Sequence, residues 1–405
     1  MITPDEAWGI VRERVRPLKP AAVPLMDALG CCLAEEVRAD RDLPPAGRSA
    51  RDGYAVRHDD LQQRPCVLRV IGEVAAGSPG RPRVKPGACA RIFTGANVPP
   101  GADTVVMVEE TQGDGDLVTI SSSVARGAHI LRQGEDAPRG MVLLPRGARL
   151  DAAEVGICAA VGKASLKVHR RPRVMVLCAG SELRSVSDRV RSHEVRNSNG
   201  PAVCAALAEW GFPGARFVPI ADQPAVLLAS LRRALKRCDA VLFTGGVSVG
   251  KYDFVRDAVE AAGAAIRFHG LAMRPGKPTL YATLPGNRHV FGLPGNPLSA
   301  FTALHEFALP ALRRLAGRPA EACRPAWWLP LAEAARSTTG FVRCELARLI
   351  DGEGGLAVLP MPSQSSADLV SAGHADGVVV LPPERTHFKA GELVKFRPWR
   401  PLPRL

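Results

Sequence analysis

Three absences in this sequence narrow its function before any motif is considered. The 10 cysteines form no C-x-x-C pair and no short cluster with the 9 histidines, so a structural zinc site is not expected. Aromatic residues make up only 5% of the chain, and no basic tract carries the stacking residues that bind nucleic-acid bases. No apolar run is long enough to cross a bilayer. Neither nucleic acid nor a membrane is therefore an expected partner.

The composition is that of a globular protein with several domains. The chain has 405 residues, 46% of them apolar, with 39 Gly and 35 Pro. This length and mixture favour roughly two to four domains with many short strands and turns. The cysteines lie mostly singly in apolar runs and are expected to be buried thiols in a reducing compartment. Thr3-Pro4-Asp5-Glu6 is a helix capping box rather than part of a signal peptide, so we expect a cytoplasmic protein.

The net charge of +13 favours acidic partners. Phosphorylated ligands fit this charge, and so would nucleic acid. Because the charge is scattered along the chain, arginine enrichment from a biased genome composition explains it equally well.

The pattern of apolar, Gly and Pro residues changes along the chain and predicts a multidomain α/β plus β protein. Residues 1–39 and 139–170 form the expected N-terminal helical and linker domain, with helices predicted at 3–15, 26–33 and 152–161. Residues 40–138 are the expected inserted, mostly β module, with strands predicted at 66–70, 89–93, 104–108 and 117–120. Residues 323–405 lose the helical pattern and predict a C-terminal β barrel, reached through a Pro-rich linker near residues 324–330.

The central section, residues 171–322, alternates strands with helices. Strands are predicted at 174–178, 217–220, 240–243 and 290–293, and helices at 202–210, 225–236, 254–262 and 298–315. This alternation predicts a three-layer α/β/α domain with a mostly parallel sheet.

The most informative segment runs from Asp239 to Asp253. An apolar strand ends at Thr244, two glycines follow, and a helix begins near residue 254, which is where α/β sheets bind ligands. Glycine lets a ligand approach the backbone N–H groups, and the helix N-terminus favours anions. A phosphate-bearing ligand is therefore predicted at Gly245, Gly246 and Gly250, with Ser248 offering a hydroxyl and Lys251 a cation. Asp253 is either a metal ligand or a helix N-cap, and an ordinary tight turn is the simpler alternative for the segment as a whole.

Three carboxylates follow strands of the same domain, at Glu182, Asp222 and Asp253. Because the carboxyl ends of parallel strands meet at one edge of a sheet, these side chains should converge there. Mg²⁺ prefers a few carboxylates together with phosphate and water. For Asp222 a helix N-cap is the simpler alternative.

Cations and prolines are expected at the same edge. Arg274 and Lys277 lie on the constrained loop Arg-Pro-Gly-Lys-Pro and are expected to contact pyrophosphate or an oxyanion. The segment Pro294-Gly295-Asn296-Pro297 follows another strand and places Pro297 at a helix start.

Three turn segments lie in or beside the inserted module: Asp52-Gly53-Tyr54-Ala55, Phe93-Thr94-Gly95-Ala96 and Gly134-Glu135-Asp136. Taken singly, each is typical of an ordinary turn or of solvated charge. In this order, together with Leu43-Pro44-Pro45, the glycine turn and the two proline loops, they resemble the motifs of the molybdopterin molybdenumtransferases. That family includes the C-terminal domain of gephyrin.

The resemblance implies an elongated, four-part homodimer whose α/β domain binds adenylylated molybdopterin. The implied reaction is the Mg²⁺-dependent insertion of molybdate at the dithiolene, with release of AMP and formation of molybdenum cofactor. Implied partners are a molybdopterin adenylyltransferase and the molybdoenzymes or chaperones that accept the cofactor. The active cleft would lie between the α/β domain of one subunit and the inserted or terminal module of its partner.

Site residues carried over from the family are assigned by matching motif positions. The catalytic set is Asp52, Thr94, Asp136, Glu182, Asp222, Arg274 and Lys277. The set that would bind the pterin nucleotide comprises Gly245, Gly246, Ser248, Gly250, Asp253, Pro294, Gly295, Asn296, Pro297, Arg343 and Ser366. The metal set is Glu182, Asp222 and Asp253.

Several positions depart from the family pattern. Ala46-Gly47 stands where the family usually has Phe-Asp, and Ser181 and Asn197 stand where it usually has aspartate. Each of these exchanges removes a negative charge near the expected site. A non-catalytic carrier or scaffold for the cofactor and a divergent paralogue that handles tungstate are therefore kept as alternatives, as is an adenylyltransferase on a related α/β domain.

Overall fold

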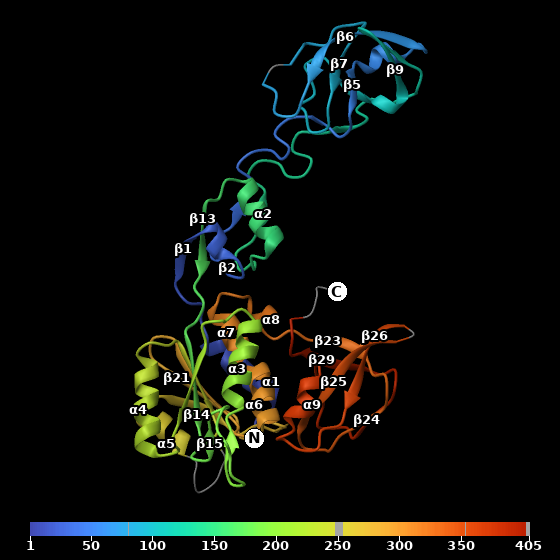
Figure 1. Ribbon diagram of the computed structural model, residues 1–405. Helices are drawn as coiled ribbons and strands as arrows, with labels where there is room; N and C mark the ends of the chain where they lie inside the picture. Colours follow the sequence, from blue (N-terminus) through green and yellow to red (C-terminus); the bar gives the residue numbers. More distant parts are fainter. Residues whose placement is uncertain (80, 248–253, 353, 402–405) are drawn as a thin grey trace. The chain divides into compact units, whose positions relative to one another are not determined.

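The structure, a computed structural model, describes residues 1–79, 81–247, 254–352 and 354–401. These residues fall into two compact units. One unit contains residues 1–34, 147–151 and 165–405, and the other contains residues 35–146 and 152–164. Each is described by itself below, with the element labels of Figure 1.

The unit of residues 35–146 and 152–164 is mostly β, and it includes residues 40–138, for which a mostly β module was predicted. Its main sheet has the strand order β8-β5-β7-β6-β10-β9. The bounds are β5 (Gly53–Val56), β6 (Cys66–Val74), β7 (Ala88–Ile92), β8 (Thr104–Met107), β9 (Thr111–Asp114) and β10 (Leu117–Ile120). Two small pairs accompany it, β4 (Arg48–Ser49) with β11 (Ile130–Leu131) and β3 (Val37–Arg38) with β12 (Val142–Leu144). Short 3₁₀ turns lie at His58–Leu61 and Val108–Glu110, and the predicted helix is α2 (Ala152–Ala160).

The other unit is built around a six-stranded sheet of order β17-β14-β18-β22-β21-β19. The strands are β14 (Val174–Ala179), β17 (Arg216–Ile220), β18 (Ala240–Thr244), β19 (Ala265–His269), β21 (Leu280–Leu284) and β22 (Arg288–Leu293). The four strands from β17 to β22 are parallel to one another. Strand β21 pairs antiparallel with β22, and β19 pairs antiparallel with β21, so only β21 runs against the others. The mostly parallel sheet is therefore confirmed, and the two antiparallel pairings at one side of the sheet were not predicted.

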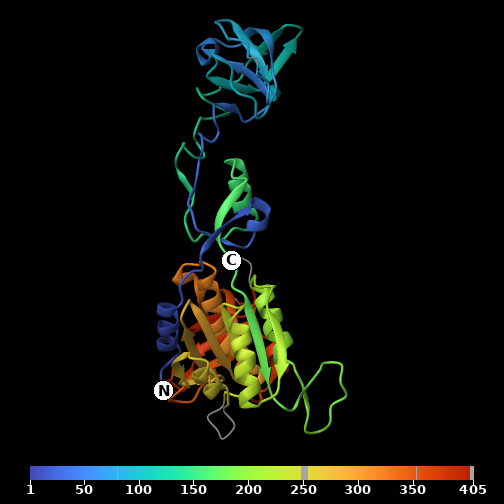
Figure 2. The ribbon, with the colours of Figure 1, turned by 90° about the vertical axis from the view of Figure 1, so that its left-hand side faces the viewer.

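Helices cover both faces of this sheet (Figures 1 and 2). They are α3 (Asn199–Glu209), α4 (Pro224–Leu235), α5 (Phe254–Ala261), α6 (Pro297–Ala303), a π-helical turn η4 (Leu304–Ala308) and α7 (Leu309–Leu315). Side chains alternate across β14, so Val176 packs with α3, α6 and α7 whereas Leu177 packs with α4 and α5. This alternation produces the predicted three layers.

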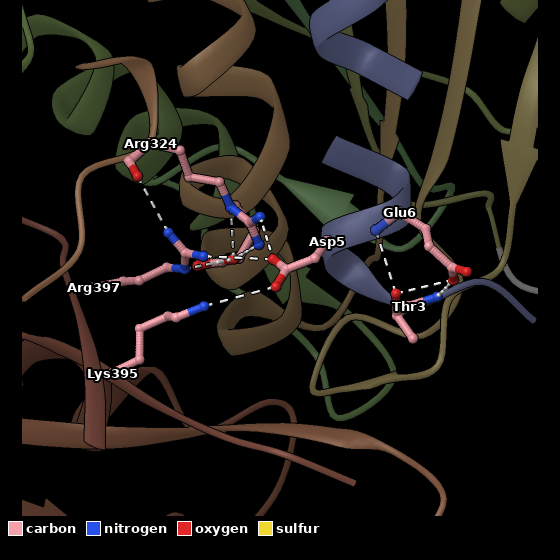
Figure 3. Close-up of polar contacts among 7 residues, drawn as sticks. Thr3, Asp5, Glu6, Arg324, Lys395 and Arg397 are labelled. Carbon is pink, nitrogen blue, oxygen red and sulfur yellow. Dashed lines mark hydrogen bonds and ion pairs between the residues drawn. The ribbon is translucent and has the colours of Figure 1, made fainter. Parts of the chain in front are cut away.

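The N-terminal helix α1 (Pro4–Arg14) begins with the predicted capping box. The Thr3 hydroxyl accepts from the Glu6 backbone N–H, and the Glu6 carboxylate accepts from the Thr3 N–H at 2.7 Å (Figure 3). After α1 come a small sheet of order β1-β13-β2 and a 3₁₀ turn at Leu25–Ala28; the strands are β1 (Pro20–Pro24), β2 (Cys32–Leu33) and β13 (Ser165–His169). A short parallel pair, β15 (Leu183–Arg184) and β16 (Val195–Arg196), follows β14.

The C-terminal segment forms a second sheet of order β20-β25-β27-β29-β23, with β26 paired to β25. The strands are β20 (Met273–Arg274), β23 (Trp327–Pro330), β25 (Val342–Gly352), β26 (Gly355–Met361), β27 (Gly377–Leu381) and β29 (Leu393–Pro398). A pair of β24 (Ala335–Arg336) with β28 (His387–Phe388) and the helices α8 (Ala320–Cys323) and α9 (Leu369–His374) complete it. A parallel bridge between Leu331, the residue after β23, and Val358 of β26 links these two strands.

A buried ion cluster attaches the C-terminal sheet to α1 and η4 (Figure 3). Arg324 donates to Asp5 at 2.7 Å and to the fully buried Glu306, and the Arg397 Nε lies 3.2 Å from the same Glu306 oxygen. Lys395 lies 3.7 Å from Asp5. Arg324 is only 9% exposed. The linker predicted near residues 324–330 is therefore wrong, because Arg324 is part of the core and the next residues enter β23 at Trp327.

Two further local predictions are wrong. The helix predicted at residues 26–33 is a 3₁₀ turn followed by β2, because Cys32 and Leu33 pair with β13 and Gly30 adopts a left-handed φ of 76°. The N-cap of α4 is Gln223 rather than Asp222, with Pro224 at the first helical position. Within the part of the chain that the structure describes, no helix combines the length and apolarity needed to cross a bilayer.

Candidate functional site

A cavity of about 1130 Å³ lies where the parallel strands of the α/β sheet end. Its lining comes from the segments that follow β14, β17, β18 and β22. The loop after β20, the start of β25 and the loop before α9 contribute the remaining residues. The predicted residues that it brings together are Glu182, Asp222, Gly245, Gly246, Arg274, Lys277, Pro294, Gly295, Asn296, Pro297, Arg343 and Ser366. Ser248, Gly250 and Asp253 lie outside the described residues.

The turn after β18 requires glycine for two physical reasons. Gly245 and Gly246 have φ values of 89° and 68°, a left-handed conformation that other residues rarely adopt. A Cβ on Gly245 would also lie 2.3 Å from the Ala179 carbonyl oxygen. Gly295 belongs to the neighbouring turn, and a Cβ there would lie 3.5 Å from the Gly245 Cα. The two turns therefore form a tightly packed backbone surface at the carboxyl ends of β18 and β22.

Glu182 and Asp222 form a carboxylate pair in the cavity. Asp222 Oδ1 is buried and has no hydrogen-bond partner. Burial raises the pKa of Asp222, and the nearby Glu182 charge raises it further. An unpartnered carboxylate oxygen beside a second carboxylate is a fitting donor set for a hard cation such as Mg²⁺, provided that phosphate and water supply the other ligands. Among the described residues, no three or more His, Cys, Asp or Glu side chains gather into a metal-binding group.

Three cations, Arg274, Lys277 and Arg343, also line the cavity. The Arg274 guanidinium stacks on the Phe341 ring at 4.2 Å, and the Lys277 ammonium lies 6.0 Å from the same ring centre. Arg343 follows two residues later in β25 and donates to Glu345. Phe341 thus holds two cations that the sequence predicted, although the aromatic residue itself was not foreseen.

The loop before α9 is joined to the α/β domain by hydrogen bonds. Asn296 Nδ2 donates to the Ser366 hydroxyl at 2.7 Å, and the Ser299 N–H donates to the Ser366 carbonyl at 3.2 Å. Pro297 occupies the first position of α6, as predicted. Asn199 also lines the cavity, and its side chain donates to the Gly295 carbonyl at 2.7 Å. Ser366 is therefore positioned against the turn that follows β22.

Asn197 was noted in the sequence as a departure from the family pattern, and the structure places it in the cavity wall. It is only 5% exposed, and its Oδ1 accepts from the Gly200 N–H at 3.0 Å. Its Nδ2 is buried without a hydrogen-bond partner. Sequence reasoning registered the changed charge here but did not assign Asn197 or Asn199 to the site.

Asp52, Thr94 and Asp136 belong to the β-rich unit. Asp52 Oδ1 accepts from both the Thr94 N–H and the Thr94 hydroxyl, at 2.7 and 2.6 Å. These bonds lower the pKa of the Asp52 carboxyl. Asp136 is exposed, and its N–H donates to the Leu43 carbonyl at 2.9 Å. The structure thus joins Asp52 to Thr94, while the lining of the large cavity comes from the other unit.

Comparison with known proteins extends over almost the entire chain. Three family models match: "MoeA N-terminal region (domain I and II)" over residues 2–162, "Probable molybdopterin binding domain" over 176–314, and "MoeA C-terminal region (domain IV)" over 329–399. A molybdopterin molybdenumtransferase of Staphylococcus epidermidis is 33% identical over 398 residues, which cover 97% of this chain and 94% of the relative. The corresponding protein of Staphylococcus aureus is 33% identical over 376 residues, or 92% and 89% of the two chains.

Solved structures agree with this assignment. A molybdopterin biosynthesis MoeA protein from Pyrococcus horikoshii superposes with a TM-score of 0.84 at 26% identity, covering 98% of this chain and 100% of that one. A second structure of a MoeA protein from the same organism gives a TM-score of 0.80 at 27% identity, covering 99% and 100% of the two chains. The sequence identity, the three domain matches and the shared fold together show that this chain belongs to the molybdopterin molybdenumtransferase family, which acts in molybdenum cofactor biosynthesis.

Proposed function

We propose that this chain inserts molybdenum from molybdate into adenylylated molybdopterin, releasing AMP and forming molybdenum cofactor. The observation that carries the proposal is a single cavity that combines a glycine turn, two carboxylates and three cations. Such a cavity can hold an anhydride of two phosphates and a tetrahedral oxyanion side by side. These three kinds of group suit a substrate that carries both a nucleotide and a metal-binding dithiolene.

Each wall of the cavity has its own task. The Gly245–Gly246 turn lets a phosphate approach the backbone closely, since no Cβ intervenes. Arg274, Lys277 and Arg343 hold the molybdate and the developing negative charge of the phosphates. Ser366 and Asn296 fix the loops that close over them. The protein therefore positions and polarises its substrates and supplies no nucleophile of its own.

The reaction involves no change of oxidation state. The two dithiolene sulfurs form bonds to molybdenum as one oxo group leaves with the two thiol protons as water. Water adds across the phosphoanhydride, so that the P–O–P bond breaks and AMP leaves. Molybdenum remains Mo(VI) throughout.

Glu182 and Asp222 would hold Mg²⁺ in this proposal. The ion would supply positive charge to the phosphoanhydride oxygens, which favours departure of AMP. The support is the unpartnered Asp222 oxygen beside Glu182. Asp253 remains a candidate third ligand outside the described residues.

The roles of Asp52, Thr94 and Asp136 depend on a homodimer, in which the β-rich module of one subunit would complete the cavity of its partner. Two hydrogen bonds from Thr94 hold the Asp52 carboxylate charged and oriented, which suits it to contact a ligand. Recipient molybdoenzymes and a molybdopterin adenylyltransferase would be transient partners.

The test is AMP release from purified adenylylated molybdopterin. We expect AMP only when both molybdate and Mg²⁺ are present, together with cofactor that reconstitutes a molybdoenzyme. AMP release without molybdate would overturn the proposal. Tight binding of the pterin without AMP release would favour a non-catalytic carrier, an alternative suggested by Ser181 and Asn197, which stand where the family usually has aspartate. Higher activity with tungstate than with molybdate would identify the divergent paralogue.

A further inference from the structure

A second, much smaller cavity lies at the amino-terminal edge of the same α/β sheet, away from the strand ends that carry the large cavity. Its volume is about 20 Å³. It lies beside the residues that follow the C-terminal ends of α3 and α7 and beside strand β2. Its lining includes Cys32, Arg149, Trp210, Arg313 and Arg318, all of them in one compact unit.

Arg313 is the unusual member of this lining. Its side chain is only 4% exposed and stacks on the Trp210 ring, with the guanidinium carbon 3.9 Å from the ring centre. One guanidinium nitrogen, Nη1, donates to the Cys323 carbonyl at 2.8 Å. The other two, Nε and Nη2, are buried and have no hydrogen-bond partner. A buried cation in this condition requires a compensating charge or acceptor.

The side chains of the cavity do not supply that charge. Of the described residues that line it, four are arginines and none is a carboxylate. Arg149 has its own partner in Asp151 at 3.3 Å, and Arg171 donates to the Leu29 carbonyl at 2.6 Å. The α7 C-terminus contributes at most about half a negative charge. Positive charge is therefore in excess around Arg313.

The nearby thiol is not the missing anion. Burial raises the pKa of Cys323 to about 12, and its Sγ donates to the Pro319 carbonyl at 3.2 Å, so the thiol is neutral. Burial, followed by the charges of Arg318 and Arg149, lowers the pKa of Arg313 to about 9. Arg313 thus remains charged at neutral pH even in these surroundings.

We propose that this cavity binds a halide-sized inorganic anion, such as chloride, between Arg313 and Arg318. The volume admits about one water-sized group, which fits a monatomic ion and excludes a nucleotide or a pterin. The ion would neutralise Arg313 and connect α7 to the region of β2 and of the residues that follow α3. It is a structural site, independent of the large cavity and of the molybdenum reaction.

Crystals of the full chain grown without halide and soaked in sodium bromide test the position directly. We expect an anomalous bromide peak in contact with the Arg313 guanidinium. A parallel soak in sodium selenate tests for a tetrahedral oxyanion. A selenate peak without a bromide peak, or water alone in both crystals, would overturn the proposal.

Thermal unfolding in sodium chloride and in sodium gluconate at equal ionic strength tests the energetic consequence. We expect chloride to raise the Tm of the wild-type chain by roughly 2–4 °C relative to gluconate, because binding stabilises only the folded state. Arg313→Met should abolish the difference. Arg318→Gln should reduce the difference. Because Arg318 is only half-buried, this variant is less prone to unfold than Arg313→Met.

Arg348→Gln is the matched control, since Arg348 is exposed on β25 and lines neither cavity. It should keep the full chloride effect. An equal chloride effect in wild type, Arg318→Gln and Arg313→Met would show that chloride acts elsewhere, and would overturn the assignment.

Discussion

Arg274 and Arg343 are register partners across the parallel pairing of β20 with β25, so two arginines from segments far apart in sequence meet at the wall of one cavity. Two like charges side by side are unfavourable unless anions lie near them. Phe341 and Glu345 compensate them in part, Phe341 by stacking on Arg274 and Glu345 by pairing with Arg343. The two guanidinium groups are suited to bind one oxyanion between them.

Replacement of Arg274 by alanine should weaken the use of molybdate. A charge-assisted hydrogen bond contributes about 1.5–3 kcal/mol, so we expect the kcat/KM for molybdate to fall roughly 10- to 100-fold. Steady-state AMP release at varied molybdate measures this. Arg343→Ala should behave similarly, whereas Arg348→Ala on the same strand should not. Unchanged molybdate dependence in both cavity variants would place the oxyanion elsewhere.

Asp222→Asn should separate stability from activity. The neutral amide removes the repulsion between Asp222 and Glu182 and relieves the burial of a charge, so the free protein should become more stable by about 1 kcal/mol. The same change removes a proposed Mg²⁺ ligand, and Mg²⁺-stimulated AMP release should fall at least tenfold. Tm and the Mg²⁺ dependence of the rate are the two measurements. A variant that loses stability and keeps its Mg²⁺ response would contradict this role.

Glu306→Gln should destabilise the chain strongly. Glu306 is buried on η4 between Arg324 and Arg397, and removing its charge would leave two buried guanidinium groups short of a counter-charge. Breaking a buried pair in this way costs about 3–5 kcal/mol. Asp5→Asn serves as control, since the Asp5 side chain is 67% exposed, and it should cost much less. Urea unfolding followed by tryptophan fluorescence would compare them, and equal costs would argue against a central role for Glu306.

Sequence patterns predicted those parts of the fold whose signals are local. The capping box at Thr3, the strand and glycine turn through Gly246 and the proline start of α6 at Pro297 depend on neighbouring residues, and all three are present. By contrast, the residues around Cys32 have a helical pattern but pair with β13 far along the chain. Strand β21, which lies between β22 and the edge strand β19, was not predicted from the sequence either.

The same distinction applies to the site. Glycines and cations in short motifs were found from sequence, and the structure brings twelve of the predicted residues to one cavity. Phe341 and Asn199 were not found, since their roles arise from contacts with Arg274 and Gly295, which lie far away in sequence. Arg324 was placed in a linker because its proline-rich surroundings conceal a partner, Asp5, at the other end of the chain.

Buried His289 should make the folded chain sensitive to mild acid. Burial lowers the pKa of His289 to about 4. Its ring lies between the Tyr281 hydroxyl at 3.0 Å and the side-chain Oδ1 of Asn287 at 3.1 Å, an arrangement that suits the neutral form. A folded-state pKa below the unfolded value of about 6.5 gives stability that is complete above pH ~6.5 and is lost as the pH falls towards ~4. The loss should be on the order of 1–3 kcal/mol. Urea unfolding midpoints measured at several pH values between about 6.5 and 4 would show this loss of stability. His289→Gln should make the midpoint depend less on pH over that range. An unchanged pH dependence in the variant would assign the acid sensitivity to other groups.

Ser181→Asp should strengthen Mg²⁺ binding if Glu182 is a ligand. Ser181 is exposed directly beside Glu182, so a new carboxylate there adds negative charge close to the proposed ion with little risk to folding. A unit charge at such a partly solvated position contributes roughly 1 kcal/mol, which corresponds to a Mg²⁺ half-saturation about five times lower. Ser185→Asp adds the same charge at another exposed position outside the cavity lining and should leave the half-saturation nearly unchanged. If both variants shift it equally, the effect is one of net charge alone, and Glu182 loses its support as a metal ligand.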